Sequence, residues 1–243
     1  MSRVISKEQC KSRDVFRSSR GPHRGAGAFC EGRVAYPYPG PPARYEHSPP
    51  VRRFGTELRT VSFRSVLPSG SERNDTVSAR LFQIDESDWK RPIVLLHGLA
   101  FSRLSMWDSF AAALARHGFP VLLLGLPFAC ERTPRGHRMG SAYTRIGPEP
   151  ALSAYEQAVA DARAALDWML GQETRERYGR PSVCSPALIG ISMGAFIGVI
   201  AAALEPRFES VVPVLGGADL DAVVFGGTYG PRMRRQLARA GIG

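Results

Sequence analysis

Long hydrophobic runs and organised cysteines are both missing from this chain of 243 residues. No stretch of 18 consecutive apolar residues occurs, so the sequence predicts no transmembrane helix. Residues 1–11 contain no apolar segment, which argues against a secretory signal peptide. The four cysteines are widely scattered and form no CxxC pair, a pattern that argues against a zinc site and is typical of a reducing compartment. We therefore expect a cytoplasmic protein that holds no metal.

The chain is basic, with 32 Lys and Arg against 22 Asp and Glu and a formal net charge of +10 at pH 7. A charge of this size can indicate nucleic-acid binding. Half of the excess lies in residues 1–50, where nine basic residues stand against four acidic ones. Most of the remainder is arginine dispersed among acidic residues, as on an ordinary solvated surface. We therefore expect no specific nucleic-acid partner.

Residues 1–53 have the composition of a disordered segment. They contain seven of the 19 prolines and show no apolar periodicity, so they cannot bury enough surface to offset the entropy of ordering. Within this segment, Tyr36–Pro42 has the proline content of a polyproline II helix that docks against an aromatic groove. A flexible tail, a start codon assigned too far upstream and a transit peptide are alternatives for the whole segment.

Beyond residue 53, short apolar runs alternate with helical patterns. The expected strands are 60–67, 77–84, 93–96, 121–124, 187–189 and 211–215, and the expected helices are 105–117, 153–169 and 195–204. The last four of these strands are almost continuously apolar, which is typical of strands buried on both faces. Strands that alternate with helices predict right-handed βαβ units, so we expect an α/β fold with a mostly parallel sheet.

The sequence GISMG at 190–194 matches the pattern G-x-S-x-G. An expected strand enters it and an expected helix of small residues leaves it, which is the setting of a nucleophile elbow. Such a turn strains its serine, here Ser192, and requires residues without bulk two positions away on either side. At the start of a helix, free backbone N–H groups favour developing negative charge. The alternative is a glycine-rich turn whose serine only caps the helix.

A second motif, LLHGLA at 95–100, ends the expected strand 93–96. A backbone N–H directly after this strand and the N–H of Met193 can together form an oxyanion hole. We assign the first of these donors to Leu99, with Ala100 as the neighbouring alternative. An ordinary strand-ending turn is the other interpretation of the motif.

In their order along the chain, these two motifs resemble those of the α/β-hydrolase superfamily, and the resemblance covers residues from about 60 to 243. The stretches 126–132 and 216–220 are similar to a bacterial branch close to esterases and dienelactone hydrolases. The resemblance implies an α/β-hydrolase fold with an eight-stranded sheet and helices on both faces. It also implies a Ser–His–acid triad and cleavage of an ester, thioester or amide through an acyl-enzyme on Ser192, with no cofactor.

One feature departs from the superfamily, in which the acid and then the histidine follow the serine along the chain. All five histidines here precede Ser192. Asp219 is a candidate for the acid or for a helix cap, and His97 either orients its loop or substitutes as the base. The expected course of the chain places His117 at the opposite end of the sheet from Ser192, whereas His137 lies in a loop at the same end. We therefore expect a core, residues 54–243, that lacks its last two strands.

Two functions follow from these residues. The first is a serine hydrolase that acts on a small-molecule acyl substrate, with Ser192 as nucleophile. The second is a truncated, catalytically inactive hydrolase-fold protein or binding module, because a serine without a general base is a poor nucleophile.

Overall fold

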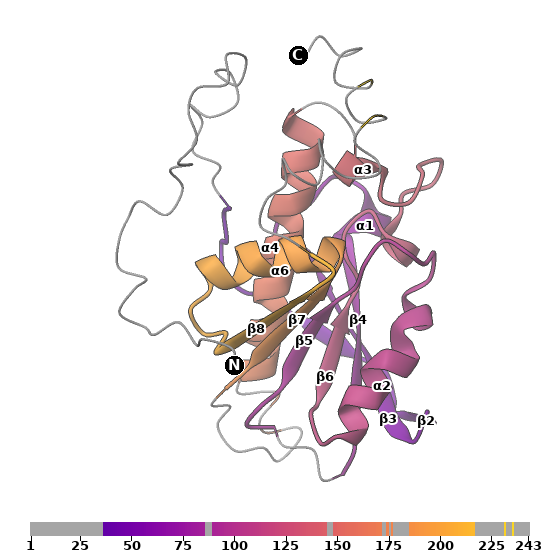
Figure 1. The fold of residues 1–243 in the computed structure, drawn as a ribbon, viewed down its shortest axis with the longest axis vertical. Coiled ribbons are helices and arrows are strands. Elements are labelled where there is room, and N and C mark those ends of the chain that lie inside the picture. Colours follow the sequence, from indigo (N-terminus) through magenta and orange to yellow (C-terminus); the bar gives the residue numbers. More distant parts are fainter. Residues whose placement is uncertain are drawn as a thin grey trace. The chain divides into compact units, whose positions relative to one another are not determined.

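The apolar runs of the sequence assemble into one mixed sheet that carries helices on both faces (Figure 1). The computed structural model describes residues 36–85, 89–144, 148–171, 174, 176, 185–216, 231 and 235, and all of these lie in a single unit, Ala35–Ile242. The strands run in the spatial order β1-β3-β4-β6-β5-β7-β8, and β2 pairs with β3. Their bounds are β1 (Tyr45–His47), β2 (Val51–Arg53), β3 (Thr56–Arg64), β4 (Thr76–Gln83), β5 (Ile93–Leu96), β6 (Val121–Leu124), β7 (Ala187–Ile191) and β8 (Ser210–Val214).

The strands β6, β5, β7 and β8 are parallel, whereas β1 to β4 join the sheet through antiparallel pairs. The parallel part confirms the fold predicted from the four apolar runs. In its register, Leu96 of β5 pairs with both Leu124 of β6 and Gly190 of β7. The carboxyl ends of these three strands therefore meet at one edge of the sheet, where the loops that follow them come together.

Helices cover the sheet on both sides, as predicted. One face carries α4 and α6, which contact each other and share a hydrophobic cluster, and the other carries α2 over a second cluster (Figure 1). The helices are α1 (Glu72–Asp75), α2 (Asp108–Arg116), α3 (Ser141–Thr144), α4 (Pro148–Leu170) and α6 (Met193–Leu204), with 3-10 turns η2 (Leu104–Trp107) and η3 (Cys130–Arg132). The start of α4 lies earlier than the predicted Ser153, since proline is well suited to the first helical position.

Residues 36–53 differ from the expected disordered segment. They include β1 and β2, and β1 pairs with β3 through Tyr45 and Phe63. The Tyr45 hydroxyl donates to the Ala164 carbonyl at 2.9 Å, the Tyr38 hydroxyl donates to Asp167, and the Arg163 guanidinium lies 4.3 Å from the centre of the Tyr38 ring. Tyrosines that bury their rings on α4 supply the surface that the composition did not suggest. We call residues 36–47 the N-terminal strap. Residues 1–35 lie outside the described part.

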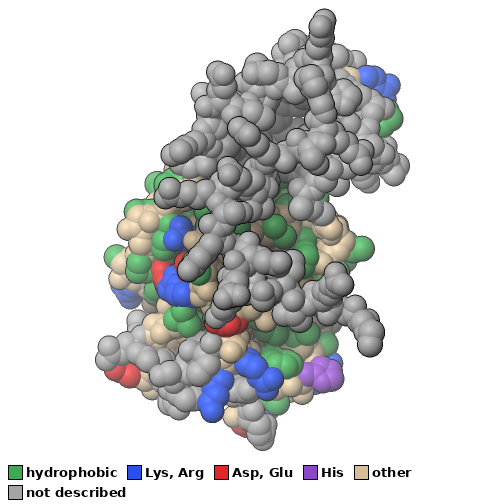
Figure 2. All heavy atoms as spheres, turned by 60° about the vertical axis from the view of Figure 1, so that its left-hand side comes forward, with side chains coloured by type: hydrophobic (Ala, Val, Ile, Leu, Met, Phe, Trp, Pro, Cys, Tyr) green, Lys and Arg blue, Asp and Glu red, His purple; other side chains and the backbone are tan. Residues whose placement is uncertain are grey.

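Basic and acidic side chains are intermingled on the face shown in Figure 2. Arg80 pairs with Asp108 at 2.6 Å and Arg207 pairs with Asp167 at 2.6 Å, so part of the positive charge is balanced locally. Among the described helices, none combines the length and the hydropathy that crossing a bilayer requires.

Candidate active site

The turn between β7 and α6 holds Ser192 in a strained backbone conformation. Its φ is 52° and its ψ is −113°, a region that residues with a Cβ rarely occupy. The Ser192 N–H donates to the Val214 carbonyl at 2.8 Å, and its carbonyl accepts from the Ala195 N–H at 2.9 Å. The backbone of Ser192 is therefore held on one side by β8 and on the other by α6, and its side chain is exposed to solvent.

The two glycines of the motif are required because a side chain at either position would clash with backbone atoms. A Cβ at Gly190 would lie 2.2 Å from the carbonyl oxygen of Gly194, and a Cβ at Gly194 would lie 2.3 Å from that of Leu96. Both clashes are with backbone, which cannot rotate away as a side chain can. The turn can therefore be this tight only because neither position carries a side chain.

The helix-cap interpretation of Ser192 is wrong. The residue occupies the N-cap position of α6, but its side chain makes no capping hydrogen bond. A capping serine also has extended backbone angles, which Ser192 lacks. Among the described residues, its hydroxyl therefore has no capping role at the carboxyl edge of the sheet.

The loop after β5 lies directly against this turn. A Cβ at Gly98 would be 3.1 Å from the Cβ of Ser192, so the loop passes too close to the turn to carry a side chain there without a shift. The next residue, Leu99, has its side chain against Gly140, where an added Cβ would lie 2.9 Å from Leu99 Cδ1. Met193 opens α6, and the N–H of a first helical residue has no acceptor within the helix. Of the two predicted oxyanion donors, Leu99 thus follows the residue that approaches Ser192, and Met193 follows Ser192 itself.

His97 is fully buried in that loop, and both of its ring nitrogens are engaged. The Leu126 N–H donates to Nε2 at 3.1 Å, so Nε2 is the acceptor, and Nδ1 donates to the Gly98 carbonyl at 2.8 Å. Burial lowers the pKa of His97 from 6.5 to about 4, so the ring is neutral at physiological pH. His97 therefore ties its loop to the loop after β6, and the structure does not support the alternative role as a substitute base.

The other candidates for proton transfer lie away from Ser192 or outside the described residues. His117 ends α2 near the amino ends of the parallel strands, as expected. His137 is exposed in a turn, and His47 lies beside Trp168, with 5.6 Å between ring centres. Within the described residues, no histidine bonds to Ser192. Asp219, the candidate acid, lies outside the described part of the chain.

A buried polar network that the sequence pattern does not predict holds the loop after β6 in place. Arg132 donates to the carbonyls of Gly125 at 2.8 Å and Asn74 at 2.7 Å, and pairs with Asp161 at 2.8 Å. The side-chain oxygen of Asn74 in turn accepts the N–H of Phe128 at 2.7 Å. Phe128 has a φ of 54°, so this network holds strained backbone close to the site. In the sequence, Arg132 stands out only as part of the stretch 126–132 that carries the resemblance, and Asn74 indicates only a turn.

Tyr155 of α4 is a second residue that the sequence did not single out. Its hydroxyl donates to the sulfur of Met193 at 3.4 Å. The periodic apolar stripe of α4 includes position 155, and such a stripe predicts core packing alone. Only the fold shows that this tyrosine reaches the residue after Ser192.

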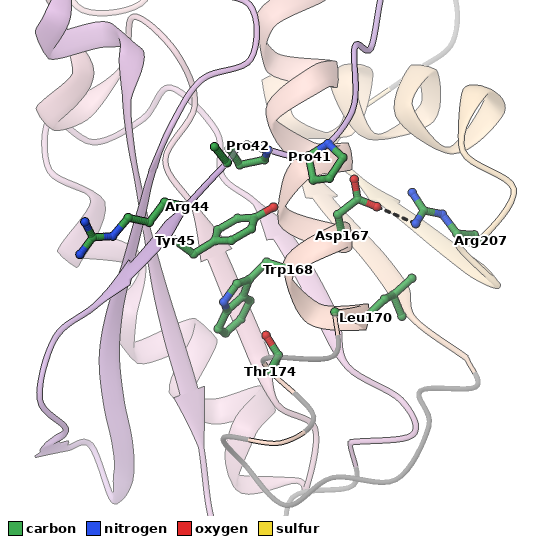
Figure 3. Close-up of a pocket in the computed structure, with 11 residues that line it drawn as sticks. Pro41, Pro42, Arg44, Tyr45, Asp167, Trp168, Leu170, Thr174 and Arg207 are labelled. Carbon is green, nitrogen blue, oxygen red and sulfur yellow. Dashed lines mark hydrogen bonds and ion pairs between the residues drawn. The ribbon is translucent and has the colours of Figure 1, made fainter.

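A pocket of about 660 Å³ lies between the N-terminal strap and the end of α4 (Figure 3). Tyr45, Trp168 and the ion pair of Asp167 with Arg207 contribute to its lining. Because α4 runs antiparallel to the strands that flank it, its end lies at the amino edge of the sheet, opposite Ser192. The pocket shares no lining residue with the turn at Ser192. Among the described residues, no group of three or more His, Cys, Asp or Glu side chains is placed to hold a metal ion.

Comparison with known proteins agrees with this geometry. The profile of the alpha/beta hydrolase family matches residues 93–243. The search of curated proteins gave no match.

Similar solved structures include a provisionally assigned acetyl xylan esterase from Bacteroides fragilis (TM-score 0.54, 15% identity, 73% of this chain and 48% of that one). An acetyl xylan esterase from Paenibacillus sp. R4 is also similar (TM-score 0.52, 18% identity, covering 82% of this chain and 66% of that one). A third is a hypothetical protein from Pseudomonas aeruginosa (TM-score 0.50, 19% identity, covering 78% of this chain and 53% of that one). At these identities the likeness concerns the fold. The chain spans about half of the length of the first and third proteins and about two thirds of the second.

Proposed function

The chain belongs to the alpha/beta hydrolase family, and on this basis we propose that it is a serine hydrolase that forms an acyl-enzyme on Ser192. The observation that carries the proposal is the conformation of Ser192. Its backbone is strained, its side chain is exposed, and its hydroxyl does not cap the helix that follows. Strain of this kind persists only where the surrounding structure enforces it, and it is concentrated at functional sites.

In the proposed reaction, Ser192 Oγ attacks the carbonyl carbon of an ester, thioester or amide. The N–H groups of Leu99 and Met193 stabilise the negative charge that develops on the carbonyl oxygen. Collapse of the tetrahedral intermediate breaks the bond to the leaving group and gives the acyl-enzyme, which water then hydrolyses to release the acid. The proton of the Ser192 hydroxyl must pass to a general base, a role that His97 cannot fill because both its ring nitrogens are engaged.

We favour an ester of a small acyl group as the substrate. Two of the similar structures are named as acetyl xylan esterases, which supports ester chemistry on this fold. The proposed reaction requires no cofactor, because the serine and the backbone amides supply the nucleophile and the charge stabilisation.

The alternative is a hydrolase-fold protein that binds a ligand without cleaving it. The engagement of both ring nitrogens of His97 favours this alternative, because it removes a nearby candidate base. In that case the strained turn would be retained from a catalytic ancestor.

Labelling with a fluorophosphonate probe and hydrolysis of p-nitrophenyl acetate distinguish the two functions. We expect the wild-type protein to be labelled and to release p-nitrophenol, and Ser192→Ala to do neither. Ser210→Ala is the matched control, because Ser210 is an exposed serine at the start of β8, at the opposite edge of the sheet. Equal labelling of the wild type and Ser192→Ala, or no labelling of either, would leave the non-catalytic alternative.

A further inference from the structure

We propose that Tyr155 is a positioning residue that anchors the side chain of Met193 and so fixes the backbone N–H beside Ser192. The inference rests on the proposed function, because it concerns the oxyanion donor of that same site. The observation behind it is the hydrogen bond from the Tyr155 hydroxyl to Met193 Sδ, at 3.4 Å.

Tyr155 is itself held firmly enough to serve as an anchor. Its ring packs edge-on against the ring of Tyr143, with 5.3 Å between their centres and an interplanar angle of 82°. Tyr143 is buried in the core cluster beneath α4. Burial raises the pKa of Tyr155, with a smaller contribution from Tyr36, so its hydroxyl keeps its proton and remains a donor at neutral pH.

Met193 is the point at which the turn needs this support. The peptide between Ser192 and Met193 carries the proposed donor N–H, and its orientation depends on the backbone angles of both residues. The Ser192 side is fixed by the hydrogen bond to the Val214 carbonyl at 2.8 Å. On the other side, methionine is unbranched and flexible. The hydroxyl of Tyr155 restricts the half-buried Met193 side chain and, through it, the backbone angles at the first residue of α6.

The contact also links the site to the N-terminal strap. Tyr36, at the start of the described chain, lies close enough to Tyr155 to affect its titration, and it packs against the same core cluster. The N-terminal strap therefore approaches Tyr155, the residue that supports Met193.

Four variants test the proposal, namely Tyr155→Phe, Met193→Leu, the double variant, and Tyr143→Phe as the matched control. Tyr143→Phe removes a buried hydroxyl that has no hydrogen-bond partner among the described residues. The measurements are the rate constant for fluorophosphonate labelling of Ser192, and kcat and KM for p-nitrophenyl acetate. A hydrogen bond of ordinary net strength corresponds to a roughly two- to tenfold change in rate.

We expect Tyr155→Phe to lower kcat and the labelling rate constant by that factor and to leave KM unchanged, because only charge stabilisation in the transition state is lost. In the Met193→Leu background, the same substitution is expected to have no further effect, because leucine offers no acceptor. Tyr143→Phe is expected to react like the wild type.

Three results would overturn the proposal: wild-type rates in Tyr155→Phe, a change confined to KM, or an equal fall in the Met193→Leu background. If the wild type itself is not labelled at Ser192, the proposed function and this inference fail together. If Ser192 is labelled and Tyr155→Phe is labelled equally fast, only the inference fails. If Tyr155→Phe does not fold, Met193→Leu still tests the proposal. This variant removes the sulfur that accepts the hydrogen bond, and it must then slow the labelling of Ser192 by the same factor.

Discussion

Acid is expected to destabilise this fold through His97, because its ring is buried in the neutral form. The unfolded chain takes up a proton near pH 6.5, whereas the folded protein resists protonation until about pH 4. The contribution of the neutral His97 ring to the free energy of unfolding is therefore fully present above pH 6.5 and is lost as the pH falls toward 4. Below pH 4 the loss levels off. The difference in pKa of about 2.5 units corresponds to about 3 kcal/mol in the free energy of unfolding.

Two other buried groups respond in the opposite direction, so the contribution of His97 must be isolated. Burial raises the pKa values of Asp161 and Asp108, and a carboxyl group that protonates more readily in the folded state stabilises the protein as the pH falls. Comparison with His97→Gln cancels these contributions, since glutamine can donate and accept hydrogen bonds but does not titrate.

Urea unfolding of the wild type and His97→Gln, followed by tryptophan fluorescence between pH 7.5 and 4.5, measures the effect. We expect the stability advantage of the wild type to shrink by about 2 kcal/mol between pH 7.5 and pH 5. The exposed His137 supplies the control variant, His137→Gln, which changes the same residue type outside the core. A pH-independent difference between the wild type and His97→Gln would refute the assignment of a buried, neutral ring.

Two further substitutions test the turn and the strap. Gly190→Ala would place a Cβ 2.2 Å from a backbone oxygen, so we expect its free energy of unfolding in urea to fall by about 3 kcal/mol or more. The control is Gly136→Ala, whose Cβ would meet open space, and we expect it to lower the free energy of unfolding by about 1 kcal/mol. Equal losses in the two variants would contradict the steric argument. Tyr38→Phe removes the hydrogen bond to Asp167 and keeps the ring, so it should cost about 1 kcal/mol. Wild-type stability in Tyr38→Phe would show that the strap is held without this bond.

The sequence was sufficient to predict the parallel core and the turn at Ser192. Both depend on local patterns, since a strand buried on two faces must be continuously apolar and a tight turn must have glycine beside it. The strap could not be predicted, because Tyr38 and Tyr45 are ordered by contacts with α4, more than 100 residues later in the chain. The sequence leaves two roles open for His97 for a similar reason. Its ring is engaged only once folding brings the Leu126 N–H to Nε2.

The hydrogen bond from the Ser192 N–H to Val214 makes the turn an extension of the hydrogen-bond ladder between β7 and β8. On its other side, β8 has no partner strand among the described residues. Strands at a sheet border fray first when a protein is warmed, well before the interior melts. The reactive geometry of the serine is therefore tied to a strand at one border of the described sheet, and we expect gentle heating to abolish labelling while the core remains folded.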